Sequence, residues 1–267
     1  MRRAVSSGSP KPGTQSAWRL DGSRALITGG SSGIGLAMAG ELASLGADLV
    51  LVARHADKLE QARAGLLADH PSRLVEVLVA DLSVDEDRQG LAQSLTGKLN
   101  ILVNNAGINI RKRVADLSLA EYRRVLEVNL TACFDMCRLL YPRLRDSAPS
   151  CIVNNASVAG LTHLRTGAPY GMSKAAMIQL TRNLAAEWAA EGIRVNAVAP
   201  WYIETPLASQ VLSQPQYRQE VLDRTPMKRT GTVEECARAM AFLCMPAAGY
   251  VTGQCLAVDG GFSIFGF

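Results

Sequence analysis

Two side chains suited to proton transfer, Tyr170 and Lys174, lie four residues apart. The residues around them have a helical period, so both side chains are expected on one face of a helix. An ammonium group beside a phenol stabilises the phenolate and lowers a phenol pKa that is ordinarily about 10. Such a tyrosine can act as acid or base nearer neutral pH. Taken alone, however, this spacing is also typical of a solvated helix surface.

A glycine-rich segment suited to phosphate binding runs from Thr28 to Gly35 and reads Thr-Gly-Gly-Ser-Ser-Gly-Ile-Gly. It follows an apolar strand directly and opens a helix. Glycines at such a junction let the backbone turn tightly and approach a pyrophosphate, which rests on the amides of the helix N-terminus. This context predicts a dinucleotide site with contacts from Gly29, Ser31, Ser32, Gly33, Ile34 and Gly35.

The end of the next strand indicates which dinucleotide is preferred. Sites of this kind that take NAD place an acidic residue there to hold the ribose 2′-hydroxyl. This chain instead has Val52-Ala53-Arg54-His55. The guanidinium of Arg54 suits a 2′-phosphate, so NADP(H) is favoured over NAD(H). The alternative is that Arg54 is a solvated loop charge.

The elements that position these residues alternate between apolar runs of strand length and longer segments of helical period, which indicates βαβ units. Strands are expected at 24–28, 48–53, 74–79, 101–104, 151–154, 194–198 and 255–258. Helices are expected at 33–45, 56–69, 85–95, 119–144, 170–191 and 233–245. The pattern predicts a single-domain α/β Rossmann fold, a doubly wound seven-stranded parallel sheet with helices on both faces. Ligands bind such sheets beyond the C-terminal ends of the strands, where the irregular segment 201–230 is a candidate substrate lid.

Length and composition fit one globular domain. The 267 residues are 48% hydrophobic and 19% charged, with a net charge of +4, which predicts no nucleic-acid partner. No apolar run approaches the roughly 20 residues of a membrane span. The six cysteines form no CxxC pair, so no metal site is expected. They are expected to be buried thiols in a reducing cytoplasm. Residues 1–17, rich in Ser, Gly and Pro, are expected to be a disordered leader before a folded domain at 18–267.

Several motifs that occur in order resemble those of the classical short-chain dehydrogenase/reductases, from about Leu20 to the C-terminus. They are the glycine-rich segment, Asp81, Asn104-Asn105-Ala106-Gly107, Asn129, Ser157, Tyr170-Gly171-Met172-Ser173-Lys174 and Pro200. The resemblance implies an oxidoreductase that interconverts a small ketone and its secondary alcohol with a nicotinamide cofactor. Framework segments such as Trp18-Arg19-Leu20-Asp21-Gly22 and Tyr250-Val251-Thr252-Gly253-Gln254 are most similar to the tropinone reductase group.

The resemblance also implies a role for each catalytic position. Tyr170 protonates the forming alkoxide or removes the alcohol proton, and Ser157 hydrogen-bonds the carbonyl oxygen. Lys174 tunes Tyr170 and holds the nicotinamide ribose, while Asn129 anchors a water relay. Two of these positions have simpler alternatives. Ser157 can cap a loop, and Asn129 can be a polar residue satisfied within the protein.

The remaining cofactor contacts implied by the resemblance follow the ends of the strands. They are Asp81, Leu82, Asn105, Ala106, Gly107, Pro200, Ile203 and Thr205, together with Tyr170 and Lys174. Asp81 is placed to bond the adenine amino group, and Thr205 to hold the nicotinamide carboxamide. Most family members follow the proline with glycine, whereas this chain has Trp201. A bulky indole there forms a wall of the nicotinamide end or packs beneath the lid.

The predicted substrate wall mixes aromatic, aliphatic and basic side chains. Its members are Arg111, Ser157, His163, Leu164, Tyr170, Trp201, Tyr202 and Leu207. Arg111 argues against a cationic substrate such as tropinone itself and suits a carboxylate or polyhydroxy ketone. The alternative is that the triplet Arg111-Lys112-Arg113 is a solvated surface. The aromatic and aliphatic wall residues fit a hydrophobic cyclic or aliphatic ketone as well as a sugar acid.

Three other functions stay open at this point. A gluconate 5-dehydrogenase-like sugar-acid oxidoreductase shares the basic residues beside the pocket, and a 3-oxoacyl carrier-protein reductase needs a basic docking surface for its acidic carrier. A nucleotide-binding regulator has little use for the intact Ser157, Tyr170, Lys174 and Asn129. The family resemblance also implies a homotetramer, for which the apolar tail at 262–267 is suited.

Overall fold

The computed structural model describes residues 16–266 and contains a seven-stranded sheet in the order β3-β2-β1-β4-β5-β6-β7. The strands are β1 (Arg24–Thr28), β2 (Asp48–Ala53), β3 (Val75–Val79), β4 (Ile101–Asn104), β5 (Ser150–Asn155), β6 (Ile193–Pro200) and β7 (Cys255–Val258). Every neighbouring pair is parallel. The predicted doubly wound parallel sheet is confirmed, and the strand ends differ from the predicted ones by at most two residues.

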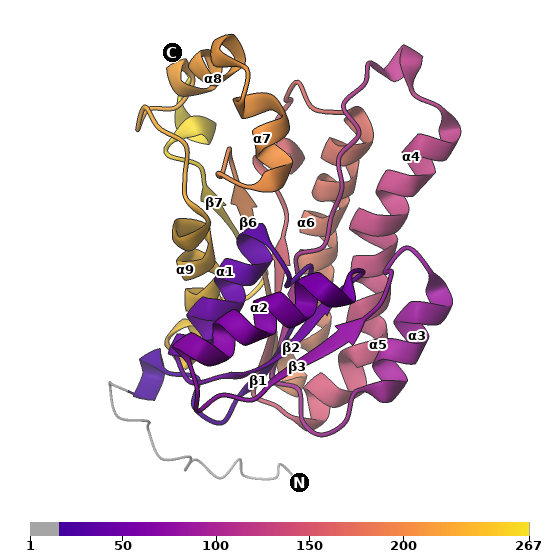
Figure 1. Ribbon diagram of the computed structural model, residues 1–267, viewed down its shortest axis with the longest axis vertical. Helices are drawn as coiled ribbons and strands as arrows, with labels where there is room; N and C mark the ends of the chain where they lie inside the picture. Colours follow the sequence, from indigo (N-terminus) through magenta and orange to yellow (C-terminus); the bar gives the residue numbers. More distant parts are fainter. Residues whose placement is uncertain (1–15, 267) are drawn as a thin grey trace, which may run out of the picture.

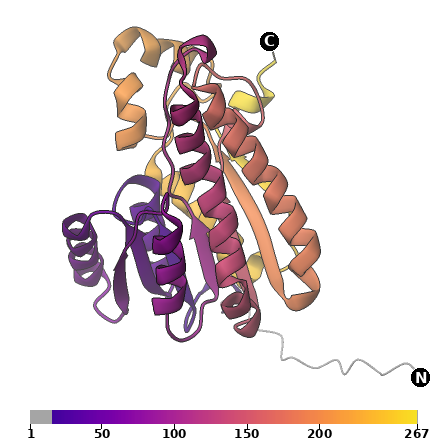
Figure 2. The same ribbon diagram turned by 90° about the vertical axis from the view of Figure 1, so that its right-hand side faces the viewer.

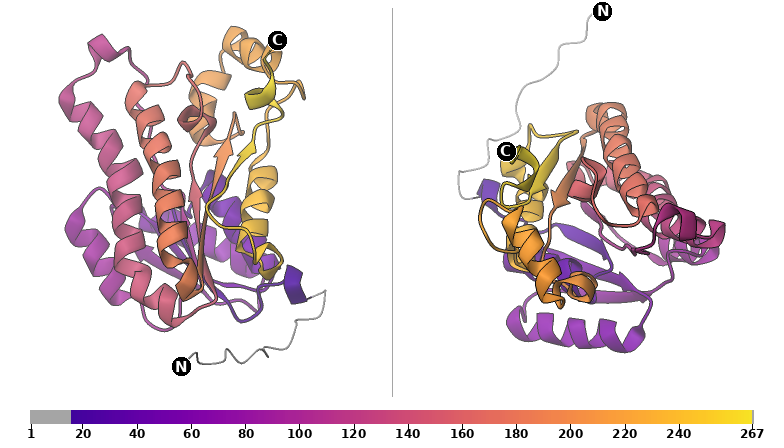
Figure 3. Two further views of the ribbon diagram at one scale, coloured as in Figure 1. Left: turned by 180° about the vertical axis from the view of Figure 1, so that it is seen from behind. Right: turned by 90° about the horizontal axis from the view of Figure 1, so that it is seen from above.

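Alternation along the strands places helices on both faces of the sheet. In β1, Ala25 and Ile27 pack in one core with α1 and α9, and Leu26 packs in the other with α5 and α6. The helices are α1 (Gly33–Ser44), α2 (Ala56–Asp69), α3 (Asp85–Ser94), α4 (Leu119–Leu126), α5 (Ala132–Asp146), α6 (Ala168–Trp188), α7 (Pro206–Leu212), α8 (Pro215–Asp223) and α9 (Val233–Cys244). Figure 1 shows α1, α2 and α9 on one side of the sheet, and the left view of Figure 3 shows α5 and α6 on the other.

The single helix predicted at 119–144 is interrupted by a π-helical turn. Helices α4 and α5 are joined through η3 (Glu127–Thr131), and Figure 2 shows them end to end beside α6. A capping box between Ser118 and Glu121 begins α4, as a Ser-x-x-Glu pattern predicts. The π turn was not predicted because one widened turn leaves the apolar period almost unchanged. It carries Asn129, one of the predicted catalytic residues.

The segment 201–230 was predicted to be irregular, but it contains the two short helices α7 and α8. Thr205 begins α7 by accepting a hydrogen bond from the N–H of Ala208 at 3.1 Å, and a proline opens each helix, as is common in a first turn. Helices this short carry too few apolar positions to show a period. Both lie beyond the carboxyl ends of the strands (Figure 1), where the lid was expected.

The remaining expectations concern the termini, the cysteines and the membrane. Of the predicted leader at 1–17, only Ser16 and Ala17 are described, and both lie in the 3₁₀ turn η1 (Ser16–Trp18). All six cysteines are free thiols, five of them buried. From residue 16 to residue 266, no helix is long and apolar enough to cross a membrane.

Candidate active site

A cavity of about 690 Å³ opens at the carboxyl edge of the sheet. It lies over β1 and β4, where the order of strands reverses, which is the usual ligand position in doubly wound sheets. The predicted cofactor and substrate residues line this cavity, with the exceptions of Gly35 and His163. His163 is exposed and lines a neighbouring cavity of about 450 Å³, together with Leu164 and Trp201. Its place in the substrate wall stays a prediction.

The glycine-rich turn owes its shape to two close approaches. Gly29 and Gly33 have φ of +66° and +55°, which favours glycine. A Cβ on Gly29 would lie 2.9 Å from Nδ2 of Asn105, and one on Gly35 only 2.2 Å from the carbonyl oxygen of Gly29. Gly35 therefore allows α1 to pack beneath the turn, which explains why it does not line the cavity as predicted.

The hydroxyl of Thr28 joins the turns after β1 and β4. It accepts hydrogen bonds from the N–H groups of Asn105 at 2.9 Å and Ala106 at 3.1 Å and donates to the carbonyl oxygen of Val103. Asn105 in turn accepts a hydrogen bond from Nδ2 of Asn155 at 2.8 Å. The two walls of the nucleotide half are thus locked together. Asn155, the last residue of β5, was not predicted as a site residue, although it directly follows the strand predicted at 151–154.

The same half of the cavity fits an anionic dinucleotide. Ser32 precedes α1 and makes no side-chain cap, and the N-terminal amides of a helix attract phosphate. Arg54, His55 and Lys58 line the cavity at the end of β2, and all three are exposed. His55 and Lys58 were missed, although Lys58 stands four residues beyond Arg54 at the start of a predicted helix. These side chains would hold the phosphates of a dinucleotide.

Tyr170 and Lys174 lie in the first two turns of α6 and face the loop after β5. The Nζ atom of Lys174 donates to the carbonyl oxygen of Asn155 at 2.6 Å and lies 5.7 Å from the centre of the Tyr170 ring. Ser157 accepts a hydrogen bond from the N–H of Ala159 at 3.1 Å and also lines the cavity. The loop-capping alternative for Ser157 therefore coexists with its place in the site.

Burial dominates the acid–base properties of this pair. Lys174 is 3% exposed, and burial lowers its pKa to about 8. Burial also raises the pKa of Tyr170 above its ordinary value, although the Ser157 side chain and the Arg111 charge lower it. The expected lowering of the Tyr170 pKa by Lys174 is not found. The ammonium group points at a carbonyl oxygen and is itself destabilised by burial.

Asn129 lies fully buried in η3 and does not line the cavity. Its Oδ1 accepts a hydrogen bond from the N–H of Ile108 at 2.8 Å, and its Nδ2 donates to the Ile108 carbonyl at 2.9 Å and to Ser173 Oγ at 3.2 Å. A Cβ on Gly107 would lie 3.3 Å from Asn129 Oδ1 and 3.8 Å from Lys174 Nζ. The amide is thus satisfied within the protein, close to Lys174, and a water relay stays a prediction.

Trp201 satisfies both of its predicted alternatives. It lines the cavity and stacks on Phe262, with ring centres 3.7 Å apart and planes 8° from parallel. Its Nε1 donates to Oγ1 of Thr225, just after α8, at 2.9 Å. Beside it, the hydroxyls of Tyr202 and Tyr217 are 2.5 Å apart. The indole therefore forms a wall of the cavity and bonds the segment that follows α8.

Arg111 faces the catalytic end of the cavity. Its Nη1 lies 3.5 Å from Oε1 of Gln210 in α7, and its Nε is buried without a hydrogen-bond partner. The charge is close enough to lower the pKa of Tyr170. The solvated-surface alternative describes the exposed Lys112 and Arg113 but not Arg111.

Comparison with known proteins agrees with this geometry. A family model described as enoyl-(acyl carrier protein) reductase matches residues 29–263. A tropinone reductase homolog of Arabidopsis thaliana is 43% identical over 258 residues, 95% of this chain and 97% of the relative. The chain belongs to the classical short-chain dehydrogenase/reductase family. This oxidoreductase is tropinone reductase-like, as its framework segments predicted.

Two solved structures have nearly the same fold as this short-chain dehydrogenase/reductase. A putative NAD(P)-dependent gluconate 5-dehydrogenase from Beutenbergia cavernae with bound NADP is 36% identical, with a TM-score of 0.89 over 93% of this chain and 99% of that one. L-Sorbose reductase from Gluconobacter frateurii, complexed with NADPH and L-sorbose, is 32% identical, with a TM-score of 0.86 over 92% and 98%. Both share the fold that places the cavity at the carboxyl edge of the sheet.

Proposed function

We propose that the protein is an NADP(H)-dependent oxidoreductase that interconverts a ketone and a secondary alcohol. One observation carries the proposal. Tyr170, Ser157 and Lys174 line one end of a cavity whose other end is formed by the glycine-rich turn and the N-terminus of α1. When bound, the nicotinamide supplies the hydride for reduction or accepts it for oxidation.

The side chains of the protein handle the proton and the developing negative charge. The hydroxyl of Tyr170 donates its proton to the substrate oxygen as that oxygen becomes an alkoxide, and it accepts the proton in the reverse direction. Ser157 uses an oxygen lone pair for Ala159, and its own proton, which lies within reach of Tyr170, would bond the same substrate oxygen. Lys174 keeps further N–H donors beyond its bond to Asn155, which suits it to the ribose hydroxyls.

The preference for NADP(H) over NAD(H) rests on charge at the end of β2. Arg54, His55 and Lys58 are exposed there, and β2 ends without the acidic residue that holds a ribose 2′-hydroxyl in NAD sites. The acid that lines this half, Asp81, has its Oδ1 engaged by the N–H and hydroxyl of Ser83 at 2.9 and 2.8 Å. The two solved relatives described above hold NADP or NADPH.

A sugar acid or another anionic, hydroxyl-rich ketone is the second candidate substrate, and Arg111 favours it. The Nε of this side chain is buried without a partner, and its Nη1 makes only a long contact to Gln210. A substrate carboxylate would satisfy this guanidinium. A protonated amine such as tropinone would be repelled by it.

The test is consumption of NADPH, and separately of NADH, with cyclic ketones, keto sugar acids and acetoacetyl thioesters. Turnover that prefers NADPH and is lost in Tyr170→Phe is expected. The substrate that is consumed distinguishes the two candidates, and Arg111→Met should weaken only the turnover of anionic ketones. Tight NADPH binding without turnover of any substrate would favour the nucleotide-binding regulator. The homotetramer and the cytoplasmic location stay predictions. Sedimentation would measure the oligomeric state.

A further inference from the structure

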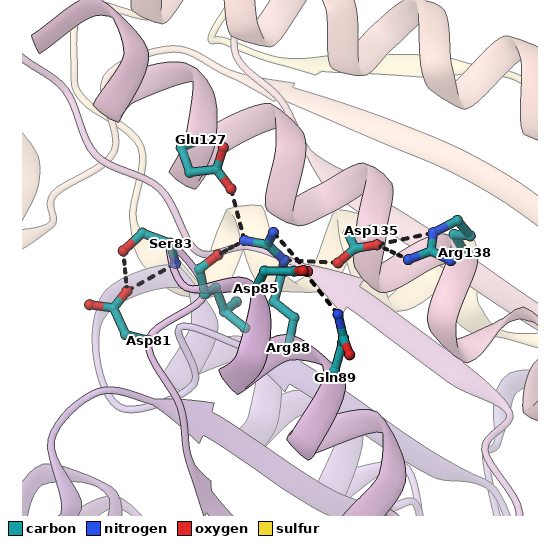
Figure 4. A network of polar contacts seen from close by, with 9 residues as sticks. Asp81, Ser83, Asp85, Arg88, Gln89, Glu127, Asp135 and Arg138 are labelled. Atoms are coloured by element: carbon teal, nitrogen blue, oxygen red, sulfur yellow. Dashed lines mark hydrogen bonds and ion pairs between the residues drawn. The ribbon is translucent and has the colours of Figure 1, made fainter. Parts of the chain in front are cut away.

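Arg88 is a buried cation that the mechanism above does not use. Its side chain lies in α3 with 4% of the residue exposed. It donates to Asp135 at 2.9 Å, to Glu127 at 2.9 Å, to Asp85 at 3.4 Å and to the carbonyl oxygen of Leu82 at 2.7 Å. Figure 4 shows Asp85, Glu127 and Asp135 converging on one guanidinium from α3, η3 and α5. Removing an arginine from water costs several kcal/mol, so the arrangement needs a reason.

The first reason lies in the π-helical turn. Glu127 is the first residue of η3, and Asp135 lies in α5, just after η3 ends. Arg88, on the neighbouring helix α3, therefore pairs with both flanks of the turn. π turns are rare in proteins, and those that occur are frequently found at functional sites. Asn129 lies between the two flanks, so the turn sets the position of its side chain. The side-chain amide bonds both the N–H and the carbonyl oxygen of Ile108.

The second reason lies at the other end of the cavity. Leu82 and Asp81 line the nucleotide half, in the loop after β3. The Nη1 atom that donates to Leu82 also donates to Glu127. A single nitrogen thus connects the nucleotide loop with the turn that carries Asn129.

We propose that Arg88 is a positioning residue that holds the nucleotide loop and the Asn129 turn in register. The proposal rests on the function proposed above, because its catalytic half is measured through turnover. Arg88 does not line the cavity. It acts on cofactor binding through Leu82 and on proton transfer through η3 and Asn129.

The catalytic half is tested by two matched variants, Glu127→Gln and Asp85→Asn. Each neutralises one carboxylate that pairs with Arg88, but only Glu127 belongs to η3. We expect Glu127→Gln to lower kcat about fivefold and to leave the NADPH Kd unchanged, because the Leu82 contact is intact. Asp85→Asn should change neither quantity. In Asn129→Ala, where the turn no longer carries an amide, Glu127→Gln should cause no further loss of kcat.

The binding half is tested by Arg88→Lys, with NADPH titrated against protein fluorescence. Lysine keeps the charge but has one nitrogen, so it cannot reach Asp135, Glu127 and Leu82 together. We expect the NADPH Kd to rise about fivefold, while the matched Arg138→Met, which removes the other partner of Asp135, leaves it unchanged. Folding of every variant is checked by circular dichroism.

Three results overturn the proposal. They are equal effects of Glu127→Gln and Asp85→Asn on kcat, effects of Glu127→Gln and Asn129→Ala that multiply in the double variant, and an unchanged NADPH Kd in folded Arg88→Lys. The last measurement needs no turnover. It therefore separates a failure of this proposal from a failure of the proposed ketone chemistry.

Discussion

Lys174→Met is expected to stabilise the cofactor-free protein at neutral pH while abolishing its activity. Burial lowers the Lys174 pKa from 10.5 to about 8. A shift of this size corresponds to a cost of about 3 kcal/mol for keeping the ammonium inside at neutral pH. Methionine removes that cost but leaves the carbonyl oxygen of Asn155 without its partner at 2.6 Å, a loss of about 1–2 kcal/mol. The free energy of unfolding should therefore rise by about 1–2 kcal/mol.

The pH dependence of this difference has a definite sign. The native protein releases the Lys174 proton near pH 8, whereas the unfolded chain keeps it to about pH 10.5. Between these values the unfolded state binds more protons, so the stability of the wild type rises with pH. The variant lacks this rise, so its advantage is full below pH 8 and fades toward pH 10.5.

Urea unfolding of both proteins at about pH 7 and about pH 10 measures the effect. Lys58→Met is the matched control, because Lys58 is exposed, and it should change stability little at either pH. A Lys174→Met protein that is less stable than the wild type at neutral pH would refute the burial argument. A stability difference that does not change with pH would refute it equally.

Three other substitutions test the rest of the site. Arg54→Ser should lower kcat/KM for NADPH about thirtyfold, the loss of about 2 kcal/mol from a charged hydrogen bond, and leave NADH turnover unchanged; a wild type that prefers NADH contradicts the role of Arg54. Gly35→Ala should lower the melting temperature sharply, because the new Cβ meets the Gly29 carbonyl at 2.2 Å, whereas Gly65→Ala, with open space around it, should not. Arg111→Met should lower kcat/KM for keto acids about tenfold or more and spare neutral ketones, and equal losses on both would exclude a carboxylate contact.

Much of the architecture follows from local patterns that the sequence shows directly. The strands alternate or run continuously apolar, and the helices repeat with their own period, so seven strands were found with nearly correct ends. The positions of Tyr170, Ser157 and the glycine-rich turn follow from the same order, because each lies at the end of an element. The parallel sheet then brings them to one edge.

Other features depend on contacts between distant segments and on burial, which no local pattern records. Around the π turn that carries Asn129, the partners of Arg88 come from α3, η3 and α5 and from the loop after β3. His163 lines a neighbouring cavity, and Gly35 packs against both Gly29 and the distant Asn105.

The acid–base behaviour shows the division most clearly. The spacing of Tyr170 and Lys174 predicted a lowered tyrosine pKa from their charges alone. In the folded protein that pKa is raised, because burial outweighs the charges around the phenol. Residue types and spacing therefore determined which groups meet at the site, and the tertiary structure decided how strongly each holds its proton.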